Sequence, residues 1–401
     1  MTTSIYIAKT VYGGDGLGRL GDGRVVFVPG AFGGEHVRAE IVEEKKNFVR
    51  ARLASVEDAS PFRTGDGPMP QPGMVYANLS ARGECETKAS QLEEALSRAR
   101  ISVPEGAFAA RPAAGGDEAD MLNYRNKVVY HIGRAGKKYA IGYRAEPSHE
   151  IADVENDVLA RPEINAKLPE IRRNVQLMLS QGVKSARRTI EERGDVTVRW
   201  TRRSGVQWWI GEAPEGTVLR ESACGKPFDV PAGGFWQVNT MVGEALARAV
   251  AAEYAAAGAP GLVDLYCGVG VLGLVCGAKR LEGVESGRQA AEFARRNAAA
   301  LGAKDAVFHA GRAEDCLKRL DPAPGSVAIV DPPRGGMEPR VVQWLVRTAA
   351  ISRVICVSCD PATLVRDLRT LSAAFRVESV KWFNMFPRTA RFETLAVLAR
   401  R

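Results

Sequence analysis

The sequence predicts an α/β protein: a mostly parallel sheet in a Rossmann-like domain, preceded by a small β barrel and a central α+β domain. Three observations support this prediction. Short β-forming segments fill the first 55 or so residues, strands and a helix mix in the middle, and strand–helix units repeat from about residue 230. With 401 residues the chain can hold two or three domains. We predict domains at 1–57, 75–225 and 230–401.

The composition is that of an ordinary globular protein, with 45% hydrophobic and 25% charged residues, which excludes collagen and extended disorder. No apolar stretch is long enough to span a membrane. The seven cysteines are scattered and odd in number, which favours reduced thiols in the cytoplasm over a disulfide framework. The formal charge of +8 permits a polyanionic partner without establishing one.

The first segment is typical of a compact barrel of the oligonucleotide-binding type. Glycine turns separate its β-forming runs, which are Ile5–Ala8, Arg24–Val28, His36–Val42 and Phe48–Leu53. A single lysine or arginine on such a strand is usually a solvated charge. Five together moderately favour a nucleic-acid contact surface: Arg38, Lys45, Lys46, Arg50 and Arg52.

The middle of the chain mixes both kinds of element. A linker rich in proline and glycine is expected over 58–75, and a helix over Glu86–Arg98. The helix near 164–181 is expected to lie among strands at 127–133, 138–143, 196–200 and 206–210.

A glycine-rich turn follows the first strand of the last domain. Gly268, Gly270 and Gly273 form G-x-G-x-x-G, which lets a ligand approach the backbone but is a weak signal alone. Asp264 before the turn would repel a pyrophosphate, yet it suits a ligand with an ammonium and a sulfonium. Glu285 ends the next strand, where an acid can accept ribose hydroxyls. S-adenosylmethionine is therefore favoured over a nicotinamide dinucleotide, and glycines that merely make a tight turn are the remaining alternative.

Cys359 is placed at the carboxyl end of a strand, just before a helix near Pro361. We expect the helix N-terminus and nearby arginines to lower its pKa and favour the thiolate. Cys276, Cys316 and Cys356 are expected to be small buried hydrophobes. Glu393 leads into the terminal strand, where it is either an edge charge or a base.

Five motifs together resemble the RNA 5-methyluridine methyltransferase family in order and spacing: Phe235-Trp-Gln-Val-Asn, Asp264-Leu-Tyr-Cys-Gly-Val-Gly, Asp331-Pro-Pro-Arg-Gly-Gly, Ser358-Cys-Asp-Pro-Ala-Thr and Phe386-Pro-Arg-Thr-Ala-Arg-Phe-Glu. The first barrel resembles the TRAM domain, an RNA-binding module of many members. Tyr124-Arg-Asn-Lys and Ile141-Gly-Tyr-Arg resemble the central domain of the family. The resemblance covers nearly the whole chain.

The resemblance implies a class I methyltransferase that uses S-adenosylmethionine to methylate uridine C5 in structured RNA, ribosomal or transfer. Cys359 would add to C6 of the base, and Glu393 would remove the C5 proton. The implied cofactor contacts are Gln237, Tyr266, Glu285 and Asp331, beside the glycine turn at Gly268, with Asp331 also next to the target base. We expect a monomer. Two alternatives stay open: an inactive fold that only binds RNA, and a nicotinamide-dependent oxidoreductase.

The sequence also departs from the family. Many members hold a four-cysteine iron–sulfur cluster, but the corresponding stretches, 70–79 and 153–159, contain no cysteine, and only Cys85 lies nearby. We therefore predict no cluster. Asn384 and Arg391 stand where the family usually has Asp and His, and both changes add positive charge near the expected base.

Overall fold

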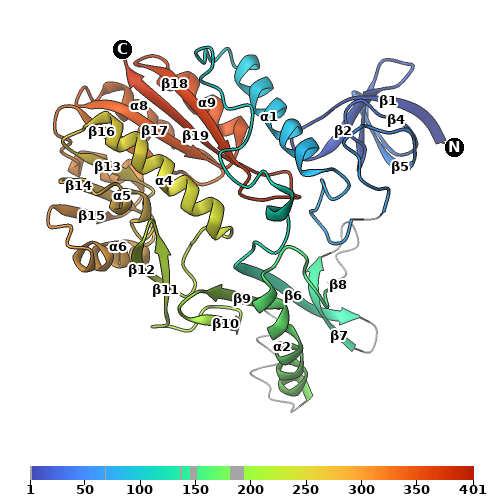
Figure 1. Cartoon of the computed structure of the whole chain (residues 1–401), viewed down its shortest axis with the longest axis horizontal. Helices are drawn as coiled ribbons and strands as arrows, with labels where there is room; N and C mark the ends of the chain where they lie inside the picture. The colour runs from blue at the N-terminus through green and yellow to red at the C-terminus, as the bar shows by residue number, and fades with distance from the viewer. Residues whose placement is uncertain (1, 68, 136–137, 145–150, 181–193) are drawn as a thin grey trace.

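The computed structural model describes residues 2–67, 69–135, 138–144, 151–180 and 194–401. Figure 1 shows three parts: a barrel at the N-terminus, a central sheet carrying one long helix, and a large sheet with helices on both faces. None of the helices in these ranges is long and apolar enough to cross a membrane.

Five strands close into the N-terminal barrel: β1 Thr2–Thr10, β2 Asp15–Arg19, β3 Val25–Pro29, β4 His36–Glu44 and β5 Phe48–Asp58. The predicted barrel is confirmed. Strand β2 was not predicted because its sequence contains two glycines, which are weak strand formers. Gly18 is required because a Cβ there would lie 2.6 Å from the carbonyl oxygen of Tyr6 on the neighbouring strand.

Helix α1 (Ala81–Arg98) connects the barrel to the large sheet. It begins before the predicted start at Glu86, because Ser80 caps it by accepting the N–H of Gly83 at 3.2 Å. Leu92 and Leu96 of this helix are buried in one core with the large sheet. A short 3₁₀ helix, η1 (Glu118–Asp120), follows.

The central part is a five-stranded antiparallel sheet in the order β10-β9-β6-β7-β8. Helix α2 (Pro162–Ser180) packs on it through Ile164, Leu168 and Ile171. A hairpin of β11 (Val218–Ala223) and β12 (Lys226–Pro231) comes next and packs on the large sheet's core. The central strands are β6 Lys127–Ala135, β7 Lys138–Arg144, β8 Ile151–Asp153, β9 Asp195–Thr201 and β10 Gly205–Ile210.

The large sheet has seven strands in the order β15-β14-β13-β16-β17-β19-β18. The first five in this order are parallel, and β19 runs antiparallel to both of its neighbours, so the sheet is mostly parallel, as predicted. The strands are β13 Leu262–Leu265, β14 Leu281–Glu285, β15 Ala306–Ala310, β16 Ser326–Val330, β17 Ile351–Ser358, β18 Phe375–Phe383 and β19 Glu393–Arg400.

Helices cover both faces of this sheet. Apolar side chains of α8 and α9 share one core with α1, whereas those of α4, α5 and α6 form the core on the opposite face. The strand order reverses between β13 and β16, which is where ligands bind in open sheets of this kind. The helices are α4 Thr240–Ala257, α5 Val271–Cys276, α6 Arg288–Ala300, α7 Ala313–Cys316, η2 Leu317–Arg319, α8 Pro339–Arg347 and α9 Pro361–Leu371.

Candidate active site

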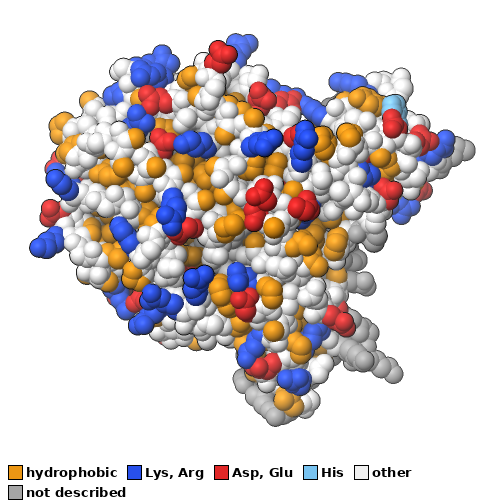
Figure 2. Space-filling view, in the orientation of Figure 1, with side chains coloured by type: hydrophobic (Ala, Val, Ile, Leu, Met, Phe, Trp, Pro, Cys, Tyr) orange, Lys and Arg blue, Asp and Glu red, His pale blue; other side chains and the backbone are white. Residues whose placement is uncertain are grey.

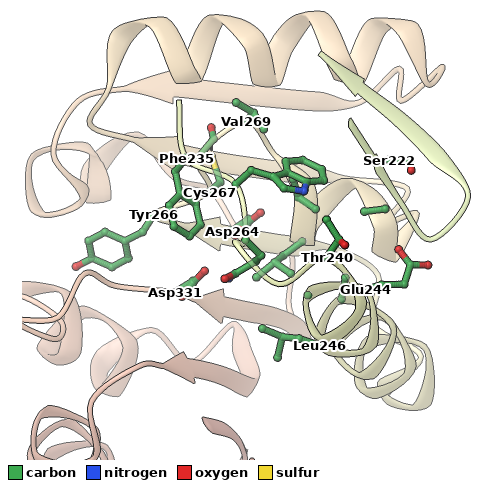
Figure 3. A pocket seen from close by; sticks show the side chains of 18 residues that line it. Ser222, Phe235, Thr240, Glu244, Leu246, Asp264, Tyr266, Cys267, Val269 and Asp331 are labelled. Carbon is green, nitrogen blue, oxygen red and sulfur yellow. Dashed lines mark hydrogen bonds between the residues drawn. The ribbon is translucent and has the colours of Figure 1, made fainter. Parts of the chain in front are cut away.

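A pocket opens at the carboxyl ends of β13 and β16, where the strand order reverses. It has a volume of about 720 Å³, including space open to solvent. Four of the five predicted cofactor residues line it: Gln237, Tyr266, Gly268 and Asp331. Figure 3 shows the carboxyl groups of Asp264 and Asp331 lying close together in this pocket.

The glycine-rich turn is held by two carboxylates. Asp264 accepts the N–H of Gly273 at 2.9 Å, and a Cβ on Gly273 would lie only 2.7 Å from that carboxylate oxygen. Glu285 does not line the pocket; it accepts the N–H of Gly268 at 3.0 Å. Tyr266 takes a left-handed backbone conformation with φ 64°, which is costly for a bulky residue and typical of functional loops. The turn is therefore fixed before any ligand arrives.

The electrostatics of the pocket suit a cationic ligand. Asp264 is fully buried, and its Oδ1 has no hydrogen-bond partner among the described residues. Burial raises the pKa of Asp264 to about 7 and outweighs the N–H of Gly273, which lowers it; Asp331 and Glu285 raise it further. Burial also raises the pKa of Asp331 to about 7. A ligand with an ammonium and a sulfonium offers the donor and the positive charge that these acids lack.

The register of the last strands brings Cys359 and Glu393 together. Ser358, the last residue of β17, is paired with Thr394 on antiparallel β19, so the next position along brings Cys359 opposite Glu393. Directly opposed residues on antiparallel strands point to the same face, with Cβ atoms about 5 Å apart. Asp331 follows β16, the other neighbour of β17, at the same edge. The two predicted catalytic residues thus lie beside the cofactor pocket.

Helix α9 begins immediately after Cys359. Asp360 caps it by accepting the N–H groups of Ala362 and Thr363 at 2.9 Å and 3.2 Å. The predicted placement of the thiol before a helix N-terminus is therefore found.

The predicted lowering of the thiol pKa is wrong. Burial, followed by the carboxyls of Glu393 and Asp331, raises the pKa of Cys359 to about 11. Arg334 and Arg391 act in the opposite direction but are outweighed. The helix N-terminus and the arginines are visible in the sequence, whereas the burial of the thiol and its two acidic neighbours depend on the folded structure. Cys359 is a neutral thiol in the free protein at neutral pH.

Glu393 is almost fully buried, at 5% exposure, and its Oε2 has no partner among the described residues. Burial and the neighbouring Asp331 raise its pKa well above the ordinary range, whereas Arg391 lowers it. A carboxylate with a raised pKa is a stronger base once it is ionised. One Nη atom of Arg391 is also buried without a partner among the described residues, so Arg391 can donate a hydrogen bond to a ligand and Glu393 can accept one.

A buried ionic network holds the loop that leads to Arg391 and Glu393. Lys88 of α1 donates to Glu84 and to Asn384, at 2.7 Å in each case. Glu84 also accepts the Asn384 amide at 3.1 Å and the backbone N–H of Arg388 at 3.0 Å. Asn384 therefore fits here because one amide both accepts from a lysine and donates to a glutamate, which an aspartate cannot do.

The sequence analysis missed this network. Glu84 and Lys88 are four residues apart on a helix, a spacing that usually marks an exposed ion pair. Only the loop packed over them reveals that both are fully buried. The only indication of this network in the sequence is Asn384, which stands where the family usually has Asp.

The barrel carries less free positive charge than predicted. Arg38, Arg50 and Arg52 form ion pairs with acidic side chains, as does Lys45 with Glu43. Residues 1–58 contain eight basic and eight acidic side chains, whereas residues 230–401 contain 22 basic and 16 acidic ones. Figure 2 shows both signs of charge interspersed on the barrel. The positive excess therefore lies mainly in the last part of the chain.

The residues do not fit an iron–sulfur cluster. Met74 of the first expected ligand stretch packs against Leu159 of the second, together with Tyr124. Burial raises the pKa of the nearby Cys85 to about 12, which disfavours the thiolate that iron requires. Within the described ranges no group of three or more His, Cys, Asp or Glu side chains is placed to hold a metal.

Comparison with known proteins gives consistent findings. Residues 316–401 match the family described as tRNA (Uracil-5-)-methyltransferase, and residues 6–54 match the TRAM domain. The chain is 29% identical to an uncharacterized RNA methyltransferase of Streptomyces avermitilis, over 98% of this chain and 97% of the relative. It is also 29% identical to one of Gloeobacter violaceus, over 100% and 96%.

A solved structure shares the whole fold. The tRNA (uracil-54, C5)-methyltransferase of Pyrococcus abyssi, in complex with S-adenosyl-L-homocysteine, is 22% identical, with a TM-score of 0.69 over 98% of this chain and 99% of that one. The acidic pocket and the glycine turn suit a cationic ligand such as S-adenosylmethionine better than a nicotinamide dinucleotide, and the Pyrococcus structure holds S-adenosyl-L-homocysteine. Two segments of the chain therefore resemble the tRNA (Uracil-5-)-methyltransferase family and the TRAM domain, and relatives that match it over nearly their whole length are named RNA methyltransferases.

Proposed function

We propose that this chain methylates C5 of a uridine in a structured ribosomal or transfer RNA through a transient bond between Cys359 and C6 of the base. One observation carries the proposal: the register of β17 and β19 sets Cys359 against Glu393, beside Asp331 at the edge of the cofactor pocket. This arrangement would bring a nucleophile, a base and a bound methyl donor to one edge of the sheet.

The thiolate of Cys359 adds to C6, and the electron pair of the C5–C6 bond moves onto the carbonyl oxygen at C4 as an enolate. C5 then has the electron density to form a bond to carbon. S-adenosylmethionine supplies the electrophilic methyl group. Glu393 next takes the proton from C5, the C5–C6 double bond reforms, and the sulfur leaves with its electron pair. The thiolate is restored at the end of the cycle.

The charges of the site determine when the thiol of Cys359 ionises. In the free protein burial, followed by the carboxyls of Glu393 and Asp331, raises the pKa of the Cys359 thiol and favours its protonated form. A cationic cofactor beside Asp331 offsets part of that negative charge and lowers the thiol's pKa again. Thiolate formation is therefore coupled to cofactor binding, which limits side reactions of the thiolate when no cofactor is bound.

The cofactor residues divide into two roles. Gln237, Tyr266 and Asp331 line the pocket and would contact the ligand directly, and Asp264 offers an unpartnered oxygen to its ammonium. Gly268 lets the backbone approach the ligand, while Glu285 orients that glycine by accepting its N–H.

The RNA is held mainly by the part that performs the chemistry. Arg334 is exposed in the loop next to Asp331, and the net positive charge is concentrated in residues 230–401. A base inside a folded RNA must be turned out of its stack to reach Cys359. The TRAM barrel, with no net charge, would recognise the RNA by shape and by local contacts. We infer a monomer in the cytoplasm.

The second candidate is a protein that binds RNA without methylating it, and the raised pKa of Cys359 is the observation that favours it. The test is methyl transfer from labelled S-adenosylmethionine to RNA lacking 5-methyluridine, with the product nucleoside identified by mass spectrometry. We expect 5-methyluridine from the wild type and none from Cys359→Ala. Cys356→Ala, three residues earlier on the same strand, is the matched control and keeps its activity. RNA binding without any methyl transfer would establish the alternative.

A further inference from the structure

Tyr12, in the turn between β1 and β2 of the barrel, extends toward the two proposed catalytic residues, Cys359 and Glu393. Its hydroxyl donates a hydrogen bond to the carbonyl oxygen of Cys359 at 3.4 Å. Its ring meets the ring of Phe392 edge-on, with centroids 6.1 Å apart. Phe392 is fully buried and immediately precedes Glu393. One half-buried tyrosine thus contacts Cys359 and the residue next to Glu393, although 347 positions separate it from Cys359.

We propose that Tyr12 is a positioning residue for Cys359 and Glu393, so that the TRAM barrel completes the catalytic site as well as contacting RNA. The inference rests on the proposed function, because that function gives these two residues their reacting roles. Neither the sequence motifs nor the family matches assign Tyr12 any part in the reaction.

The turn that carries Tyr12 is fixed to the rest of the molecule. Gln91 of α1 donates to the carbonyl oxygen of Thr10 at 3.1 Å, and Lys9 forms an ion pair with Glu94 of the same helix. Helix α1 packs in one core with α9, whose first turn follows Cys359. The barrel and the helix behind the nucleophile therefore share a support, which Figure 1 shows as α1 lying between them.

The hydroxyl of Tyr12 keeps its proton at neutral pH. Burial, followed by the charge of Asp360, raises the pKa of Tyr12 to about 12, and Cys359 and Glu393 contribute further. The hydroxyl therefore remains a donor to the Cys359 carbonyl when the thiol ionises. Because a displacement of about 1 Å can cost about 100-fold in rate, a contact that fixes the backbone of the nucleophile matters for catalysis.

The test compares Tyr12→Phe and Tyr12→Ala with Tyr6→Ala. Tyr6 lies on β1, the strand that leads into the turn with Tyr12. It is 52% exposed and its ring contacts His36 within the barrel, so it is the matched control. Single-turnover methyl transfer is measured at saturating RNA and cofactor, together with the affinity for RNA. We expect the rate to fall several-fold in Tyr12→Phe and about 10- to 100-fold in Tyr12→Ala. RNA affinity stays unchanged, and Tyr6→Ala transfers at the wild-type rate.

A wild-type rate in Tyr12→Ala, or a loss confined to RNA affinity, would overturn the inference. If Tyr12→Ala does not fold, Tyr12→Phe decides, because it keeps the ring and removes only the hydroxyl; an unchanged rate in this folded variant overturns the assignment. Cys359→Ala is measured alongside. Activity in that variant would refute the proposed function, whereas an inactive Cys359→Ala with normal Tyr12 variants would refute the role of Tyr12 alone.

Discussion

The affinity for S-adenosylmethionine should rise with pH, because Asp264 and Asp331 must ionise to meet a cationic ligand. Both have a pKa of about 7 in the free protein. For one such group the ionised fraction grows from about a tenth at about pH 6 to about nine-tenths at about pH 8. We therefore expect the affinity to increase by about tenfold over this interval, or about 1.4 kcal/mol.

Protein stability should change in the opposite direction. An acid whose pKa is raised by folding holds its proton more tightly in the native state, so the free protein loses stability as pH rises from about 4 to about 7. For Asp264, raised from 3.8 to about 7, the loss is roughly 4 kcal/mol at most. The product S-adenosylhomocysteine carries the same ammonium, and its thermal stabilisation of the protein should accordingly be larger at about pH 8 than at about pH 6.

Isothermal titration calorimetry with both ligands across this pH range measures the effect. Asp264→Asn can still accept the Gly273 N–H but carries no charge, so it should bind more weakly at high pH and show a flatter dependence. Asp305→Asn, at an exposed acid outside the pocket, is the control and should behave as the wild type. An affinity in the wild type that does not change between about pH 6 and 8 would refute the electrostatic reasoning.

Three further outcomes are expected. Lys88→Met should destabilise the protein by about 3 kcal/mol or more, because it removes the buried partner of Glu84. Arg82→Met removes an exposed ion pair on the same helix and should cost under about 0.5 kcal/mol. Equal unfolding temperatures of the two variants would contradict the buried network. The purified protein should be colourless and free of iron by elemental analysis, and stoichiometric iron would contradict the ligand argument. RNA affinity should fall as salt rises in a filter-binding assay, and a flat response would contradict phosphate contacts.

The sequence was sufficient for features that depend on local pattern. The alternating barrel strands, the glycine turn after β13 and the order of the motifs all follow from neighbouring residues. Strand β2 was not predicted because glycine has a low strand propensity. Gly18 is needed there because the backbone of the neighbouring strand approaches it closely. The start of α1 depended on one capping residue, Ser80.

Long-range features could not be predicted in this way. The opposition of Cys359 and Glu393 follows from the pairing of β17 with β19, and the high pKa of the thiol follows from burial and acids brought in by that pairing. From the sequence alone, Lys88 is an ordinary charged residue of a helix and Tyr12 an ordinary aromatic residue of the barrel. Only the docking of α1 and of the barrel against the catalytic loops gives them their positions.

Covalent trapping tests the central claim most directly. RNA carrying 5-fluorouridine is incubated with the protein and S-adenosylmethionine, and the adduct is digested and mapped by mass spectrometry. Since fluorine at C5 cannot leave as a proton, the base should stay attached, after taking up the methyl group, to the peptide that contains Cys359. No adduct, or one that still forms in Cys359→Ala, would contradict the account.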